Sequence, residues 1–146
     1  MSVELLRRRH ADYCFFLARI ALDEQVQPGG SAWPDHVGAP RAVIEAPRVS
    51  PAAARCEGLL AAWRLARRMG VATERYRTAV ELSLRFQLRH QYDAVNSYLL
   101  PRPSRARGGF YESYASPTIR IDAVQHNLAA LWGAAQMLAS EKQGKR

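Results

Sequence analysis

Asp122 and His126 lie four residues apart in a segment with helical periodicity, so their side chains fall on one face of a predicted helix. In that arrangement the carboxylate can orient the imidazole for proton transfer, and Gln125 lies on the same stripe. The spacing fits a structural role equally: Asp122 complements the helix dipole, and His126 is a hydrogen-bonded interface residue. Both interpretations stay open at the level of sequence.

Three glutamates extend the set of candidate catalytic groups. Glu57 lies in an alanine-rich helix, where it either faces a pocket or pairs with Arg55 or Arg64. Glu45 and Glu112 lie in the two long loops, where a glycosidase-like site could take an acid and a base. The alternative is that these loop carboxylates are simply solvated.

Aromatic side chains are frequent in both loops. They suit stacking on sugar rings, or they plug the end of the helical core. We therefore expect catalytic roles for Asp122, His126 and Glu57. The substrate-binding candidates are Trp33, Glu45, Tyr98, Phe110, Tyr111, Glu112 and Gln125.

Several common chemistries have no signature here. The sequence lacks a Walker loop and the GxGxxG, GxSxG and HExxH motifs. Cys14 and Cys56 lack the spacing of a zinc site, and we expect them to be reduced core thiols. No metal and no cofactor are predicted.

The formal net charge is +8, and 19 of the 21 basic residues are arginines spread along the chain. The distribution favours a solvated face with a general arginine bias over a polyanion site. No stretch approaches the roughly 18 apolar residues of a membrane span, and the N-terminus lacks the pattern of a secretion signal. We expect a cytoplasmic protein.

Apolar periodicity predicts about four main helices: residues 2–25, 51–69, 74 to about 92, and about 117–138. Ser50-Pro51 and Ser116-Pro117 are predicted helix starts, and Thr73 is a predicted cap. The second helix is rich in alanine and glycine, which predicts an inner position. The third has a charged side, which predicts an outer one.

The order of helix, long loop with Gly-Gly, and helix occurs twice. Ser50 and Ser116 are 66 residues apart, while the Gly-Gly pairs at 29 and 108 are less regular. The sequence thus predicts one all-α domain over 1–146, built from two hairpin-type repeats with two long loops on one face. Repeat one covers about 3–70 and repeat two about 73–139, followed by a polar tail at 140–146.

Three runs carry a family resemblance: PRVSPAAARCEGLLAAWRLARR, RFQLRHQYDAVNSYLLPRPSRARGGF and TIRIDAVQHNLAAL. They resemble the C-terminal repeats of α/α-toroid proteins, the six-hairpin glycosidase-like and terpenoid-cyclase-like group. That resemblance implies inner and outer helices in a ring, with loops before the inner helices forming a pocket. Its members include glycoside hydrolases, sugar epimerases, polysaccharide lyases and cyclases, so the fold does not choose the chemistry.

A complete ring needs many more helices than the roughly four predicted here. We therefore expect a homo-oligomer or a missing partner chain. The first functional hypothesis is a partial toroid with acid/base chemistry on a sugar or other polyhydroxyl substrate, which would place it in carbohydrate metabolism. The alternative is a non-catalytic helical binding or scaffold module, and a weaker one is a basic polyanion-binding protein. Whether the chain is an enzyme stays open.

Overall fold

A computed structural model gives the conformation of residues 3–42, 45–98 and 100–143. The chain is mostly helical, as predicted. The four long helices are α1 (Val3–Asp23), α2 (Val49–Arg68), α3 (Glu74–Arg89) and α5 (Ile121–Gln143). The loops add a short 3-10 helix η1 (Pro34–His36), a single-turn helix α4 (Pro103–Ala106), and strands β1 (Tyr111–Ser113) and β2 (Ser116–Ile119).

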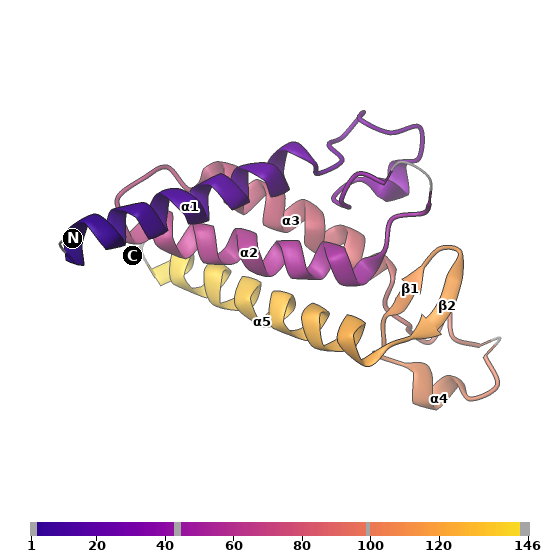
Figure 1. Ribbon diagram of the computed structural model, residues 1–146. Helices are drawn as coiled ribbons and strands as arrows, with labels where there is room; N and C mark the ends of the chain where they lie inside the picture. Colours follow the sequence, from indigo (N-terminus) through magenta and orange to yellow (C-terminus); the bar gives the residue numbers. More distant parts are fainter. Residues whose placement is uncertain (1–2, 43–44, 99, 144–146) are drawn as a thin grey trace.

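Helix α2 is at the centre of the bundle and packs against α1, α3 and α5 (Figure 1). Its small side chains explain this position, because buried alanines let neighbouring helices approach closely. The main core contains Leu59, Leu60 and Trp63 of α2, which pack with Tyr76 of α3 and Met137 of α5. The predicted inner position of this helix is confirmed.

Both long loops lie at one end of the bundle, opposite the two termini (Figure 1). Helices α2 and α5 begin at this end and run side by side in the same direction. Ser50 contacts Asp122 near their starts, and Arg67 contacts Ser140 near their ends. Side chains from the two helix starts and the two loops therefore meet there.

The Ser116-Pro117 segment is not a helix start, and this prediction was wrong. Ser116 pairs with Ser113 across an antiparallel two-stranded sheet, and Tyr111 pairs with Ile119. Proline is compatible with β2 because a two-stranded sheet leaves one edge of each strand without a pairing partner. Helix α5 begins only at Ile121.

Two other helix boundaries and one predicted cap differ in detail from the prediction. Helix α2 starts at Val49, so Ser50 lies inside its first turn rather than capping it. Thr73 is at the N-cap of α3 but makes no side-chain cap hydrogen bond, and α3 ends at Arg89, before Tyr92.

The predicted polar tail is helical from residue 140 to Gln143, while residues 144–146 lie outside the described part of the chain. Contacts of Arg67 with Ser140 and of Arg77 with Glu141 hold this last part of α5.

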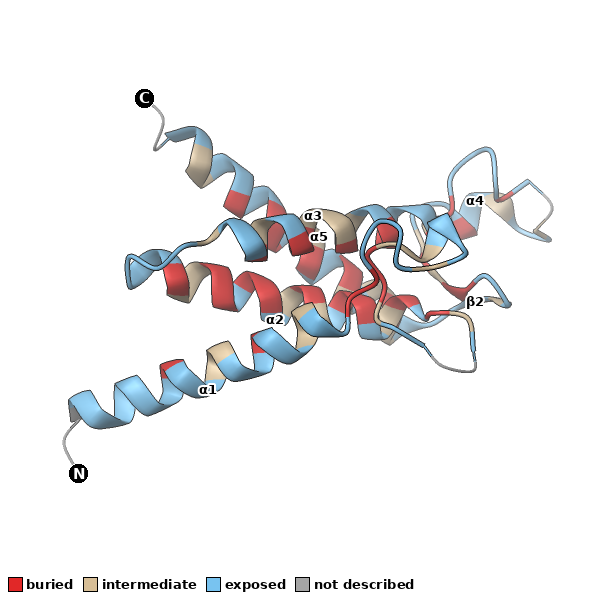
Figure 2. Cartoon of the chain, turned by 90° about the horizontal axis from the view of Figure 1, so that it is seen from above, coloured by how far each residue is buried: buried red, intermediate tan, exposed pale blue. Residues whose placement is uncertain are grey.

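Many of the apolar residues whose spacing predicts the first and last helices do not face the core. Tyr13, Phe16 and Leu17 are exposed, and most of α1 faces the solvent (Figure 2). This helix packs on the main core through the buried Ala18 and through partly buried residues such as Phe15 and Leu22. Helix α5 buries Ala130 and other mostly small residues. Its exposed large apolar side chains are Ile121, Leu128, Trp132 and Leu138. Close packing against α2 selects the small face of α5 and leaves several of its large side chains outside, whereas α1 packs through both small and large side chains.

Both cysteines are free thiols, as predicted, and Cys56 is fully buried in the core. Burial raises the pKa of the Cys56 thiol from 9.0 to about 11, so the neutral form is retained well above neutral pH. Among the described helices, none combines the length and the apolar character that crossing a membrane requires.

Candidate functional site

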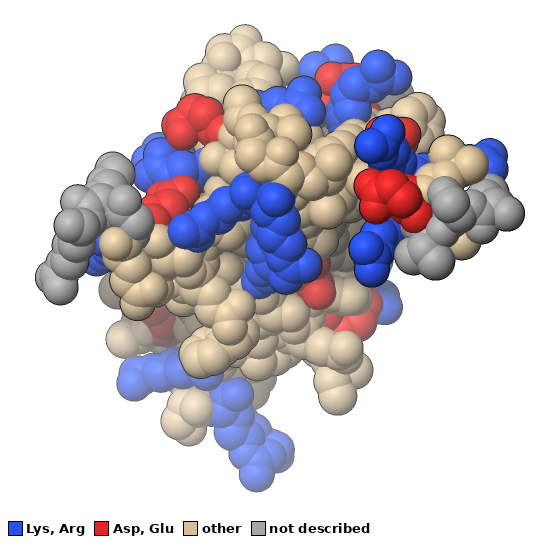
Figure 3. All heavy atoms as spheres, turned by 90° about the vertical axis from the view of Figure 1, so that its left-hand side faces the viewer, with Lys and Arg blue, Asp and Glu red and all other residues tan. Residues whose placement is uncertain are grey.

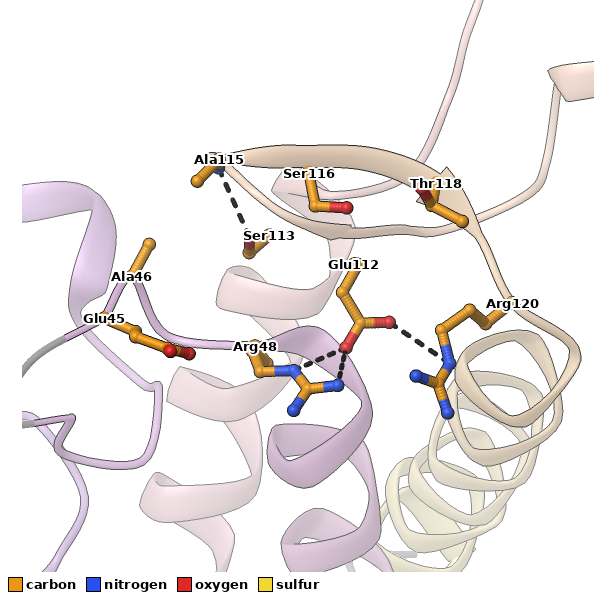
Figure 4. A pocket seen from close by; sticks show the side chains of 9 residues that line it. All are labelled: Glu45, Ala46, Arg48, Glu112, Ser113, Ala115, Ser116, Thr118 and Arg120. Atoms are coloured by element: carbon orange, nitrogen blue, oxygen red, sulfur yellow. Dashed lines mark hydrogen bonds and ion pairs between the residues drawn. The ribbon is translucent and has the colours of Figure 1, made fainter.

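A pocket of about 640 Å³ opens at the loop end of the bundle, between the loop before α2 and the β1–β2 hairpin (Figure 4). Glu45 comes from the first long loop, and Glu112 comes from β1 in the second. The sequence placed them in separate loops, and the structure brings them to one cavity. The lining residues are Glu45, Ala46, Arg48, Glu112, Ser113, Ala115, Ser116, Thr118 and Arg120.

Glu112 is held between two arginines in this pocket (Figure 4). Its side chain is only 8% exposed, whereas Arg48 and Arg120 are 46% and 51% exposed. Arg48 donates from Nε to Glu112 Oε1 at 2.5 Å and also approaches this oxygen with a second guanidinium nitrogen. Arg120 Nε lies 3.5 Å from Glu112 Oε2, too far for a strong hydrogen bond. One buried carboxylate therefore links the starts of α2 and α5.

Asp122 pairs with Arg120 and not with His126, which corrects the predicted pairing. The guanidinium donates to both carboxylate oxygens, at 2.9 and 3.0 Å. This charge-assisted pair lowers the pKa of Asp122 and raises the pKa of Arg120. Ser50 donates a longer hydrogen bond of 3.4 Å to Asp122. Asp122 thus positions Arg120 at the rim of the pocket.

His126 pairs with Glu57 across the α2–α5 contact. The Nδ1 to Oε1 distance is 2.7 Å, and both side chains are a little over one third exposed. This arrangement can orient an imidazole for proton transfer, but neither residue lines the pocket of Glu112. Glu57 therefore has a partner that the sequence did not suggest, and Arg55 pairs with Glu24 instead. Gln125, which the sequence analysis grouped with Asp122 and His126, is exposed.

The predicted aromatic residues separate into three environments. Phe110 is fully buried and packs with Val49 and Ala123, so it closes the helical core. Trp33 and Tyr98 are each 68% exposed. Tyr111 lines a second pocket of about 310 Å³, which shares Ser113 and Ala115 of the hairpin with the first. The lining residues are Tyr92, Asn96, Tyr111, Ser113, Tyr114, Ala115 and Pro117.

His90 lies beneath this aromatic pocket and was not among the predicted site residues. It is fully buried, with ring centroids of Tyr111 and Tyr114 4.8 and 4.4 Å away. Its Nδ1 lies 3.0 Å from the carbonyl oxygen of Phe86, while its Nε2 has no hydrogen-bond partner among the described residues. Burial lowers the pKa of His90, and the nearby Arg89 lowers it further.

We expect the protein to lose stability as the pH falls below about 6.5. Protonation of His90 would place a hydrogen on both ring nitrogens, and the buried Nε2–H would have no acceptor among the described residues. The pKa of His90 is lower in the folded protein than in the unfolded chain, so the unfolded chain is protonated first as the pH falls. The loss of stability therefore begins just below the pKa of the unfolded chain. The measurement is urea unfolding between pH 7.5 and 5. A His90→Phe variant should have a flatter profile over this range, and an unchanged slope would contradict the assignment. Asp122, whose pKa is also lowered, contributes only at more acidic pH.

Arg48 and Arg120 were not predicted, although the sequence contains a signal for them. Arg48-Val49-Ser50 and Arg120-Ile121-Asp122 share the pattern arginine, aliphatic, small polar, and each arginine directly precedes a helix. The two triplets are 72 residues apart, whereas the two Ser-Pro segments on which the predicted repeat was based are 66 residues apart. Ser50 and Asp122, at equivalent triplet positions, are in contact. The matching positions at the starts of α2 and α5 are therefore 72 residues apart.

The basic residues do not form one continuous surface at the end that carries the termini. Figure 3 shows Lys and Arg there in several separate places, with Asp and Glu between them. Arg77 contacts three carboxylates, and Arg8 pairs with Glu4. Within the described residues, no group of three or more His, Cys, Asp or Glu side chains is placed to hold a metal ion.

No protein-family model matches the chain, and the searches of curated proteins and of solved structures found no significant match either.

Proposed function

We propose that the chain binds a carbohydrate or related polyhydroxyl compound in the pocket of Glu112. The observation that supports this is the convergence of both long loops on one cavity lined by carboxylate, guanidinium and hydroxyl groups. Sugars present neighbouring hydroxyls that each donate and accept hydrogen bonds, and a mixed lining of this kind can satisfy both roles.

Each group has a distinct part in this proposal. The exposed faces of Arg48 and Arg120 supply donors, and Glu45 supplies an acceptor at the mouth. Ser116 and Thr118 supply hydroxyls that can take either role. Tyr111, in the adjoining aromatic pocket, offers a ring on which an extended sugar can stack.

We further propose that acid/base chemistry takes place in this pocket. Glu45 and Glu112 are the two carboxylates that reach the cavity, so we assign a reaction to them in preference to Asp122. The Glu57–His126 pair lies outside the pocket and is proposed as a catalytic pair only for a ligand that extends along α2 and α5. The toroid resemblance offers hydrolysis, epimerisation and elimination as candidate reactions and does not choose among them.

The binding proposal is tested by measuring the melting temperature with a panel of neutral sugars, sugar acids and polyols. We expect at least one compound at millimolar concentration to raise it, because a ligand that binds only the folded state stabilises that state. Thr118→Val should remove most of this increase. Thr78→Val, an exposed change on α3, should leave it intact. If no compound raises the melting temperature, or if both variants respond alike, the proposal fails.

The scaffold alternative has its own supporting observation, the exposed apolar side chains on α1 and α5. A protein that only displays such faces would associate with a partner and ignore sugars.

Two further expectations stay proposals. The parallel course of α2 and α5, with both loops at one end, supports a toroid arc. The two free cysteines support a cytoplasmic location.

A further inference from the structure

The outward face of α5 carries a continuous uncharged stripe. Its members recur at alternating intervals of four and three residues, and all of them are exposed. We call this set the α5 stripe: Ile121, Gln125, Leu128, Trp132, Ala135 and Ala139. Intervals of this kind keep side chains on one line along a helix, which is the pattern of a helix–helix seam.

Charge is absent from this helix over an unusual length. No Asp, Glu, Lys or Arg occurs from Ala123 to Ser140, in a chain of which 23% of residues are charged. An exposed helix normally has charged residues on its solvent side. Depletion of charge together with an exposed tryptophan is typical of the core of a protein interface. Trp132 is 70% exposed and Ile121 88% exposed.

The order of side-chain sizes along the stripe indicates what covers it. Large residues occupy its first part and alanines its last part, and the stripe is symmetric about residue 130. In an antiparallel pairing with a second copy, Ile121 would lie opposite Ala139, and Leu128 opposite Trp132. Each bulky N-terminal side chain then meets a small C-terminal one, apart from the central Leu128–Trp132 contact. A parallel pairing would place alanine on alanine and leave gaps.

We propose that two copies of this chain associate through antiparallel α5 helices related by a two-fold axis near residue 130. An isologous contact of this kind uses the same patch on both chains. The proposal goes beyond the ligand pocket and does not depend on it.

The area of the stripe places the proposed interface at the small end of specific contacts. Ile121, Leu128 and Trp132 together leave on the order of 400 Å² of apolar surface in water on each chain. With the smaller residues, the pair would bury roughly 1,000 Å² in total, the lower limit for a specific interface. We expect weak association, with a dissociation constant on the order of 10 μM.

Sedimentation equilibrium of the full chain from about 1 to 300 μM tests the proposal around that expected affinity. The mass should rise from 16.4 kDa towards twice that value. Trp132→Glu should weaken association by at least about 30-fold, as expected for a central aromatic residue of an interface. Tyr13→Glu, at the 63% exposed aromatic of α1, should change it less than about 2-fold. Circular dichroism of both variants serves as the control that each is folded.

Cysteine pairing tests the orientation in a Cys14→Ser background. Chains with Leu128→Cys mixed with chains with Trp132→Cys should form a disulfide-linked dimer readily, and each chain alone should do so poorly. Efficient linkage within the Leu128→Cys chain alone would indicate a parallel pairing and overturn the proposed geometry. A monomer throughout the concentration range, or a dimer that is lost with Tyr13→Glu and kept with Trp132→Glu, would overturn the α5 interface.

Discussion

Gly38→Ala is expected to destabilise the protein by about 3 to 5 kcal/mol. Gly38 has a φ of +92°, a conformation that side chains with a Cβ rarely adopt. An added Cβ would lie 2.0 Å from the carbonyl oxygen of Leu82 and 2.4 Å from its carbonyl carbon. Both are backbone atoms of α3, so no rotation of a side chain relieves the clash.

The loop around Gly38 is fixed on both sides, which prevents it from moving away. Gly38 donates to the carbonyl of Val26 at 2.9 Å. Gln25 Nε2 donates to the carbonyl of Ala79 at 2.9 Å and to that of Gly38 at 3.3 Å. The first long loop is thereby held against α3, and the substitution must break these contacts or distort the helix.

Gly58→Ala is the matched control for the glycine substitution. Gly58 lies in the middle of α2 and its added Cβ would meet nothing within 4 Å, so alanine should stabilise the protein by about 0.5 to 1 kcal/mol. Chemical unfolding of both variants gives the comparison. Equal effects, or a tolerated Gly38→Ala, would show that the loop does not approach α3 as closely as described.

Arg48→Ala should cost about 2 to 3 kcal/mol, because it removes the closest partner of a buried carboxylate. The side chain of Glu112 is 8% exposed, and Arg120 contacts it only at 3.5 Å. Arg41→Ala, an exposed arginine of the same loop, should change stability by less than about 0.5 kcal/mol.

Glu112→Gln distinguishes loss of charge from loss of shape. The amide retains the size of the side chain and one acceptor, so we expect a smaller loss in this variant than in Arg48→Ala. In the double variant the two losses should not add, since both remove the same interaction. Strict additivity in urea unfolding would contradict a direct Arg48–Glu112 contact.

Much of the architecture could be predicted because periodicity and small-residue content act locally. The alanines and glycine of α2 indicated its central position, and the four long helices follow the apolar spacing. The same spacing did not reveal that α1 and α5 turn large apolar side chains outward. Periodicity reports that a face is apolar, but it does not report whether this chain or another one covers it.

The site was harder to predict because its partners come from distant segments. Helical spacing placed Asp122 next to His126, but a guanidinium two residues away competes better for the carboxylate. His126 instead finds Glu57, 69 residues earlier in the chain. The hairpin that carries Glu112 was missed because Ser-Pro is a helix-start signal that an edge strand also tolerates.

The most direct test of the proposed ligand site is NMR chemical-shift mapping. A labelled sample is titrated with the sugar or polyol that raises the melting temperature most. The account predicts saturable shifts of the Nε–Hε signals of Arg48 and Arg120 and of the amides of Ser113, Ser116 and Thr118. Saturable shifts confined to another part of the molecule, or no shift at these five residues at millimolar ligand, would contradict it.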